Sequence, residues 1–325
     1  MGEIMLRKMN GRYLVSLLLG LLLVFGIYIQ YKVVPIVSEQ RKIGTTYMTM
    51  NNAFYKIVNA EIEKEVASHG DILYTRDPAL SVNKQCEQIQ SFIDKKVDAI
   101  IINPVDSGSQ KITTALKKAR KKGIHIIVVD SQLQDSQVAD VTVVSDNYRA
   151  GVLDAEHMMA TVPRADILLL EHKDTLSAVD RIDGFLDTIA EHPQYRIVAR
   201  RESKGQTEIS MPAVHAVIED GVPFNVVMAL NDQSAIGALA AIKEKALSHK
   251  IFIYGVDGSP DMKNLLRNTD DITATVAQSP VDMGAKTIQS AYAMLDGQPV
   301  EMVITIPVAL LDKTNIETVD VEGWQ

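Results

Sequence analysis

Five short apolar runs in this chain each end on a side-chain amide or a carboxylate, and the residues at these ends are Asn103, Asp130, Asn231, Asp257 and Gln278. Continuous apolar runs are typical of strands covered on both faces, as in a parallel sheet. Ligands of open α/β sheets bind in the crevice outside the carboxyl ends of the strands. We therefore expect these side chains to surround one cleft. Their donors and acceptors, with one or two negative charges, suit a neutral, hydroxyl-rich molecule such as a sugar.

Each of these residues also has a simpler interpretation. A polar residue at a strand end often caps a helix or forms a turn, and Asn231 and Asp257 fit that role. Asp130 and Asp257 could also form a glycosidase pair. That chemistry normally uses an acid whose pKa is raised by an apolar pocket, whereas these two lie among amides. Five such ends in register favour a binding site, and we predict neither catalytic residues nor an enzyme.

Two aromatic residues follow the first expected strand, in the segment Asn51-Asn52-Ala53-Phe54-Tyr55. One interpretation is a turn and helix start with two core aromatics. The other is that Phe54 or Tyr55 lies against the apolar C–H face of a sugar ring. Aromatic residues make up only 5% of the chain, so two at this position favour the second interpretation, together with the strand-end residues.

Composition excludes several kinds of partner. With 325 residues, 46% of them apolar, the chain can form a full core, and we expect two lobes. A net charge of −8 argues against nucleic acid or an anionic membrane surface as a partner of the soluble part. The single cysteine, Cys86, allows no intramolecular disulfide. Glycine-rich nucleotide motifs, H-E-x-x-H and calcium loops are absent, so we expect no cofactor and no metal site.

The N-terminal segment resembles a membrane anchor. Arg7, Lys8 and Arg12 precede a stretch without charges at 13–29, which is at the short end of what spans a bilayer. We expect residues 1–12 in the cytoplasm, 13–29 as a single transmembrane helix, 30–41 as a stalk and the rest outside the cell membrane. Cleavage as a secretory signal is the alternative, although no small-residue cleavage site or lipoprotein cysteine follows the stretch.

From residue 42 onward, short apolar runs alternate with amphipathic stretches, which is the pattern of βα repetition and predicts an α/β fold with parallel sheets. Strands are expected at 43–47, 71–74, 98–102, 125–129, 141–144, 165–170, 197–201, 226–230, 251–255, 272–277 and 303–306. Helices are expected at 54–68, 85–95, 110–122, 148–160, 178–191, 211–220, 234–245 and 280–295. No helix separates the strand ending at Val129 from the one starting at Val141, so we expect two sheets to meet there.

Ten motifs occur in order along the chain, at 42–44, 50–55, 102–107, 129–132, 145–147, 181–185, 230–232, 236–239, 255–261 and 277–280. Together they resemble the ribose-binding branch of the type I periplasmic sugar-binding proteins. The resemblance implies two Rossmann-like lobes, joined by three hinge strands, that close over a monosaccharide. It places lobe 1 at 42–145 and 279–307, and lobe 2 at 146–278 and 308–318. The crossings are expected near Ser145, Ser279 and Pro307.

Carried over position by position, the resemblance implies a set of sugar contacts: Asn52, Phe54, Tyr55, Asn103, Asp130, Ser131, Asn231, Asp257 and Gln278. Four family contacts are altered. A serine is replaced by Met48, two arginines by Ser131 and Val179, and an aromatic position falls near Gly205. These changes predict weak binding of ribose, and a hexose, a deoxysugar or a differently configured pentose as the ligand.

Three function classes follow from the resemblance. The chain is expected to deliver a monosaccharide to the permease of an ATP-driven (ABC) importer. The alternative is a membrane-anchored receptor that signals through a sensor histidine kinase. The fold also occurs in LacI-type repressors, but these need a DNA-binding helix-turn-helix where this chain has a hydrophobic stretch, so that class fails. Genes encoding a permease or a kinase beside this one would separate the first two.

Overall fold

The computed structural model describes residues 11–33, 40–247 and 249–324, and the chain divides into two units, residues 1–40 and 41–325. In the first unit, helix α1 (Gly11–Val33) is longer than the expected span at 13–29. Its apolar side chains between Val15 and Tyr28 are exposed. Within the described residues, no helix meets the length and hydropathy that crossing a bilayer requires. Most of the expected cytoplasmic segment (1–10) and of the stalk (34–39) lies outside the described residues.

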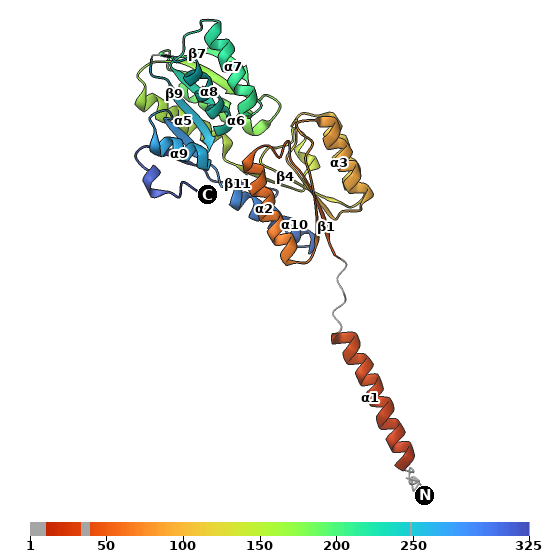
Figure 1. Cartoon of the computed structure of the whole chain (residues 1–325). Helices are drawn as coiled ribbons and strands as arrows, with labels where there is room; N and C mark the ends of the chain where they lie inside the picture. The colour runs from red at the N-terminus through yellow and green to blue at the C-terminus, as the bar shows by residue number, and fades with distance from the viewer. Residues whose placement is uncertain (1–10, 34–39, 248, 325) are drawn as a thin grey trace. The chain divides into compact units, whose positions relative to one another are not determined.

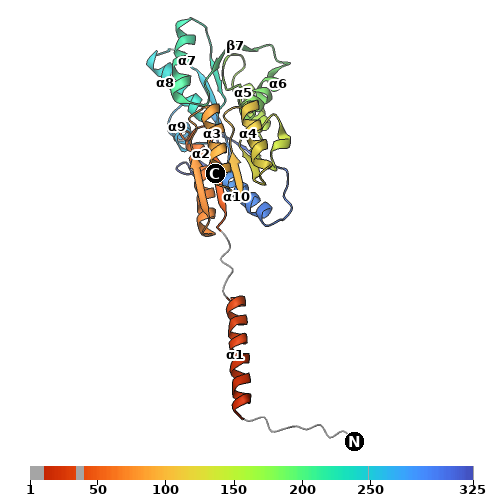
Figure 2. The same ribbon diagram turned by 90° about the vertical axis from the view of Figure 1, so that its right-hand side faces the viewer.

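The second unit contains two six-stranded sheets, each covered by helices (Figures 1 and 2). The first sheet has the order β11-β5-β4-β3-β1-β2 and is entirely parallel. Its strands are β1 (Lys42–Thr46), β2 (Ile72–Arg76), β3 (Ala99–Ile102), β4 (His125–Val129), β5 (Val141–Ser145) and β11 (Val303–Ile306). The helices beside it in sequence and packing are α2 (Ala53–Ser68), α3 (Val82–Asp94), α4 (Gln110–Arg120) and α10 (Pro280–Leu295), with a 3-10 turn, η1 (Ser136–Val138).

The second sheet has the order β12-β10-β9-β8-β6-β7, and only β12 runs antiparallel to its neighbour. Its strands are β6 (Ala165–Glu171), β7 (Tyr195–Glu202), β8 (Val226–Ala229), β9 (Phe252–Asp257), β10 (Ala274–Ala277) and β12 (Ala309–Asp312). Its helices are α5 (Asn147–Thr161), α6 (Leu176–Ile189), α7 (Thr207–Glu219), α8 (Asp232–Glu244), α9 (Pro260–Asn268) and the 3-10 turn η2 (Ile316–Thr318). We call the halves built on these two sheets the first and second lobes.

The predicted parallel-sheet architecture is confirmed. The apolar runs form strands whose residues are buried throughout, as in β3, β4 (from Ile126) and β8, because helices cover both faces of each sheet. The chain passes between the sheets three times, after β5, after β10 and after β11.

One prediction about the sheets is wrong. We expected two sheets to meet between Val129 and Val141, but β4 and β5 are parallel neighbours in the first sheet. The 3-10 turn η1 replaces the connecting helix there, and the chain leaves the first sheet only after β5. Two elements were not predicted, β12 and α9. Helix α9 has a clear start signal, since Ser259 caps it through the amide of Met262 and Pro260 occupies its first turn.

Candidate functional site

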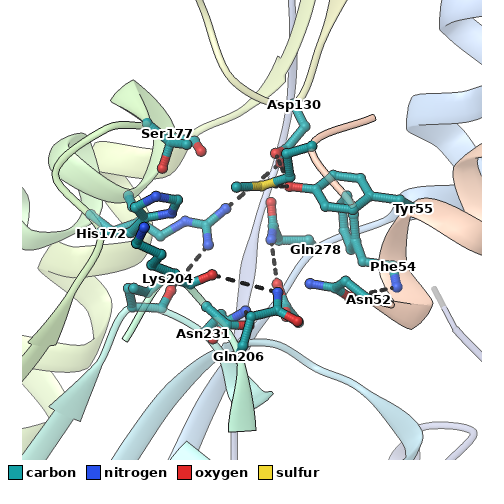
Figure 3. A pocket seen from close by; sticks show the side chains of 17 residues that line it. Asn52, Phe54, Tyr55, Asp130, His172, Ser177, Lys204, Gln206, Asn231 and Gln278 are labelled. Carbon is teal, nitrogen blue, oxygen red and sulfur yellow. Dashed lines mark hydrogen bonds and ion pairs between the residues drawn. The ribbon is translucent and has the colours of Figure 1, made fainter. Parts of the chain in front are cut away.

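One cavity lies between the carboxyl ends of the two sheets and is lined by residues of both lobes. Seven of the nine predicted site residues line it: Asn52, Phe54, Tyr55, Asp130, Asn231, Asp257 and Gln278. Figure 3 shows Asp130 and the aromatic pair on one side, with His172, Ser177, Lys204 and Asn231 on the other. Both lobes therefore contribute to one enclosed site.

Asp130 follows β4 and is held from several sides. Its carboxylate accepts hydrogen bonds from the Tyr55 hydroxyl (3.0 Å) and from the Asn103 amide (3.2 Å). The Arg181 guanidinium of the second lobe lies 3.9 Å away. Burial raises the pKa of Asp130, whereas Arg181 and the two hydrogen bonds oppose that rise. The Asp130 backbone has φ = 67°, a left-handed conformation that is costly for a residue with a side chain.

Asp257 ends β9 and has a similar combination of burial and strain. Its φ of 140° lies in a region that favours glycine. The Gln278 amide donates to its carboxylate at 2.7 Å. Burial, followed by the charge of the neighbouring Asp232, raises the pKa of Asp257 well above its usual range. Both central acids thus occupy strained backbone at a strand end, and strain of this kind is concentrated at functional sites.

Asn52 and Asn231 both cap helices, as the simpler interpretation expected for Asn231. The Asn52 oxygen accepts from the Phe54 amide (2.9 Å) at the start of α2, and the Asn231 oxygen accepts from the Ser234 amide (3.0 Å) at the start of α8. Because each cap uses the side-chain oxygen, the amide nitrogens remain as donors. That of Asn231 donates to the Gly205 carbonyl at 3.1 Å. Capping fixes both side chains at the cavity wall, so the two interpretations are compatible.

Two predicted site residues do not line the cavity. Asn103 is fully buried behind Asp130, where it accepts from the Met48 amide (3.1 Å) and donates to the Val129 carbonyl (3.2 Å). Ser131 is fully buried as well, and its hydroxyl pairs with that of Ser107 at 3.2 Å. These two residues lie one layer behind the cavity surface.

Arg181 was quoted in a motif but was not predicted as a site residue. It lines the cavity, and its side chain is only 5% exposed. It donates to the Asn147 side chain (2.8 Å) and to the Leu230 carbonyl (3.0 Å). Helices α5 and α6 pack closely at Gly151 and Gly184, and this packing brings Arg181 close to α5. A Cβ added at Gly151 would lie 1.8 Å from a backbone oxygen of α6, and one added at Gly184 would lie 2.1 Å from a backbone oxygen of α5. Arg181 therefore places a guanidinium group beside Asp130, although the two family arginines are absent.

His172, Lys204 and Gln206 also line the cavity and were not predicted. His172 follows the largely apolar strand β6, so the strand-end rule that found the amides applies to it, whereas Lys204 and Gln206 follow β7, which is not an apolar run. Burial lowers the pKa of His172, which favours the neutral ring. Of the altered positions, Met48 and Gly205 line the cavity. Val179 does not line it, but the adjacent Ala178 does.

The two lobes contact each other around the cavity. The Ser107 amide donates to the Asp174 carbonyl at 2.8 Å, and the Ser177 amide donates to the Ser131 hydroxyl at 3.2 Å. On another side, the Asn51 amide donates to Glu208 at 3.0 Å. The lobes are therefore closed on each other.

The site offers many neutral donors and acceptors, two buried carboxyls and one apolar wall. Within the described residues, no group of three or more His, Cys, Asp or Glu side chains is placed to hold a metal ion. Carboxylates accept hydrogen bonds from hydroxyls, amides can donate and accept, and Phe54 presents an aromatic surface. This set is suited to a small, neutral, hydroxyl-rich molecule.

Comparisons with known proteins agree with this architecture. The chain is 28% identical to the ribose import binding protein of Bacillus subtilis over 84% of its own length and 88% of that protein. It is 28% identical to a D-apiose import binding protein of Actinobacillus succinogenes, over 70% of each chain. The structure superposes with a TM-score of 0.78 on the binding protein of the arabinose ABC transporter from Shewanella sp. ANA-3, bound to L-arabinofuranose, with 26% identity and coverage of 85% and 93%.

The family assignment rests on most of the folded part of the chain. Residues 43–299 match the periplasmic binding protein domain, which covers both sheets except the last strands, β11 and β12. The chain is therefore a member of the periplasmic binding protein family.

Proposed function

We propose that this protein captures a neutral monosaccharide between its lobes and delivers it to the permease of an ABC importer, without chemical turnover. The observation that carries the proposal is the pair Asp130 and Asp257, one from each lobe, held in strained backbone on opposite sides of one cavity. Strain at both positions requires a compensating benefit. The import binding proteins for ribose and D-apiose support a sugar as the ligand.

The lining residues account for how a sugar is held. Asp130 and Asp257 accept hydrogen bonds from ring hydroxyls, and the donors of Asn52 and Arg181 meet the remaining oxygens. Phe54 covers the C–H face of the ring. Asn103 is assigned a positioning role, because it orients Asp130 from behind the cavity.

Ligand exchange is proposed to occur by hinge opening at the three crossings near Ser145, Ser279 and Pro307. The closed lobes enclose the cavity, so a sugar enters and leaves only when they separate. Small-angle scattering is expected to give a larger radius of gyration without sugar than with it. An unchanged profile at saturation contradicts a clamshell movement.

The altered positions bear on which sugar is bound. Met48 makes the first-lobe wall more apolar, and Gly205 presents no side chain on the second. Ser131 is turned away toward Ser107, so it does not replace a family arginine. Arg181 supplies one guanidinium from a different position. We therefore propose weak binding of ribose and preference for a hexose, a deoxysugar or a differently configured pentose. Submicromolar affinity for ribose contradicts this.

Membrane anchoring through residues 13–29 remains a proposal supported by the sequence pattern, namely the charge-free stretch behind three basic residues. The expected outcome is a full-length chain in the membrane fraction with its lobes outside the cytoplasm. Mass spectrometry of the mature N-terminus tests it, since a chain that starts between Ile29 and Lys42 is a cleaved and secreted protein.

The test of the central proposal is calorimetry on a fragment that starts at Arg41, against a panel of aldoses and ketoses. At least one neutral sugar is expected to bind with measurable heat, and it is expected to be recovered unchanged. Absence of heat from every sugar, or formation of a product, overturns the proposal.

A further inference from the structure

The C-terminal segment of the second lobe reaches the sugar-facing wall of the first lobe. Val321 is 4% exposed and belongs to the core of the second lobe. Three residues later, Trp324 packs against the core of the first lobe. Its ring lies edge-to-face on Phe54, with 5.9 Å between centroids and 77° between planes. The C-terminal segment therefore adds an aromatic contact between the lobes to the three covalent crossings and the hydrogen bonds described above.

This segment is fixed to the second lobe by a buried lysine. Lys263 of α9 is fully buried, and its ammonium donates to the carbonyls of Asp320 and Gly323, both at 2.6 Å. Burying an ammonium group is costly unless it is paired or hydrogen-bonded. The carbonyls of Asp320 and Gly323 offset the cost of burying the ammonium only when the segment 320–323 lies against α9. Lys263 therefore fixes the position of Trp324, the next residue along the chain.

Trp324 contacts a residue that faces the ligand. Phe54 lines the cavity and packs edge-on against Tyr55, with 5.7 Å between ring centroids. Tyr55 in turn donates to Asp130. Nearby, before the first turn of α2, Asn51 donates to Glu208 of the second lobe. Trp324 therefore lies among contacts that join the lobes at the start of α2.

We propose that residues 320–324 form a latch, in which Trp324 is a positioning residue that holds Phe54 against the bound sugar and slows reopening of the lobes. The effect on sugar rests on the proposed function, whereas the contact with α2 does not. Because the latch adds a contact between closed lobes, its loss is expected to accelerate dissociation more than it slows association. Edge-to-face aromatic pairs predict about three- to tenfold faster dissociation.

Four variants of the fragment that starts at Arg41 test the latch. Trp324→Ala removes the ring, and Trp324→Phe is expected to restore most of the retention, because it keeps an aromatic edge. Lys263→Met frees the segment from α9 and is expected to reproduce the effect of Trp324→Ala with the tryptophan still present. Glu322→Ala is the control, because its side chain lies in the same segment and is exposed.

Two measurements keep the latch and the sugar assignment separate. Stopped-flow dissociation is measured with whichever sugar the parent fragment binds among D-ribose, L-arabinose, D-apiose, D-allose and the rest of the aldose and ketose panel. Hydrogen exchange of the first turn of α2 is measured at saturating sugar, where the lobes are closed, and without sugar only where the parent fragment binds none of the sugars. Faster hydrogen exchange in Trp324→Ala and Lys263→Met, but not in Glu322→Ala, supports the latch, whether or not a sugar binds. Absence of binding by every sugar overturns the proposed function and leaves the latch standing. Unchanged exchange, or unchanged dissociation of a bound sugar, overturns the latch.

Discussion

The two walls of the cavity differ in chemistry. The wall of the first lobe consists of Met48, Asn52, Phe54, Tyr55 and Asp130, so it is largely aromatic and apolar with one carboxyl group. The wall of the second lobe carries the imidazole of His172, the guanidinium of Arg181, the ammonium of Lys204 and the carboxyl of Asp257. A sugar ring has an apolar C–H face and a polar rim of hydroxyls. The first wall fits the face and the second fits the rim, so neither lobe alone is complementary to the ligand.

The two walls also differ in how many carboxyl groups are buried behind them. Behind the second wall, Asp154 and Asp232 are fully buried, and burial raises the pKa of each. Asp232 is compensated by hydrogen bonds from Thr275 (2.6 Å) and from the Ser259 amide (2.7 Å). Both carboxyl oxygens of Asp154 are buried with no hydrogen-bond partner in the part of the chain that the structure describes. The second lobe therefore holds two buried acidic groups behind its wall, Asp154 and Asp232.

The largest expected effect comes from removing the acid of the second wall. Asp257→Ala is expected to weaken sugar binding by about tenfold or more, because it removes the hydrogen bonds of this side chain to sugar hydroxyls and leaves their partners and the Gln278 amide unpaired in a buried site, at about 1–3 kcal/mol for each unpaired group. Calorimetry with the sugar that the parent protein binds gives the ratio of dissociation constants. Asp183→Ala, an exposed carboxylate on α6, is the control and should leave affinity unchanged. Equal affinities for Asp257→Ala and the parent would remove Asp257 from the site.

A second prediction concerns the buried acid Asp154 behind that wall. Burial raises the pKa of Asp154 well above its usual range, so the native state holds a proton that the unfolded chain releases above about pH 4. Its contribution to stability is complete below the unfolded-state pKa and is lost as pH rises through the native one. Asp154→Asn is therefore expected to be more stable at neutral pH, by about 1–2 kcal/mol, with a flatter pH dependence.

Urea unfolding across pH 4–8 measures this effect, and Asp183→Asn serves as the exposed control. If Asp154→Asn were less stable than the parent at neutral pH, Asp154 would be an ionised partner of Arg181 instead of a protonated acid.

The third prediction concerns the aromatic wall. Phe54→Leu keeps an apolar side chain but loses the flat surface, so affinity is expected to fall about three- to fivefold, less than for Asp257→Ala. Competition binding with the same sugar resolves this difference. Phe252→Leu, a partly buried phenylalanine of β9 outside the cavity-lining set, is the control. A larger loss for Phe54→Leu than for Asp257→Ala would reverse the assigned roles of the two walls.

The sequence predicted the first wall better than the second, for a physical reason. Asn52, Phe54 and Tyr55 form the cap and first turn of α2, the helix that follows β1, so their position is set by local sequence. Arg181 reaches the cavity from within α6 because two helices pack closely, and that packing leaves no strand-end pattern. Lys204 follows β7, whose charged and half-exposed residues do not form the apolar run that marks a buried strand end.

The sequence also did not predict which strand-end side chains line the cavity and which are buried behind it. Asn103 occupies a predicted strand end and Ser131 follows the one at Asp130, yet both side chains turn into the protein interior. A strand-end position predicts the rim of the sheet, but it does not predict which way the side chain turns there. The fold itself depends on repeated apolar runs, so its parallel sheets were predicted almost completely.

The smallest expected effect is a difference in stability between two variants of Asp257, which separates its role in binding from the backbone strain at this position. Its φ of 140° is unfavourable for any side chain but not for glycine. Asp257→Gly relieves that strain, although glycine also makes the unfolded chain more flexible, which offsets about 0.4–1 kcal/mol. We therefore expect Asp257→Gly to be more stable than Asp257→Ala by about 1 kcal/mol, while both lose affinity equally. Thermal unfolding of the two sugar-free variants gives the difference. If alanine were as stable as glycine at this position, the backbone would be unstrained, and the strain at Asp257 would no longer support a binding role for the second wall.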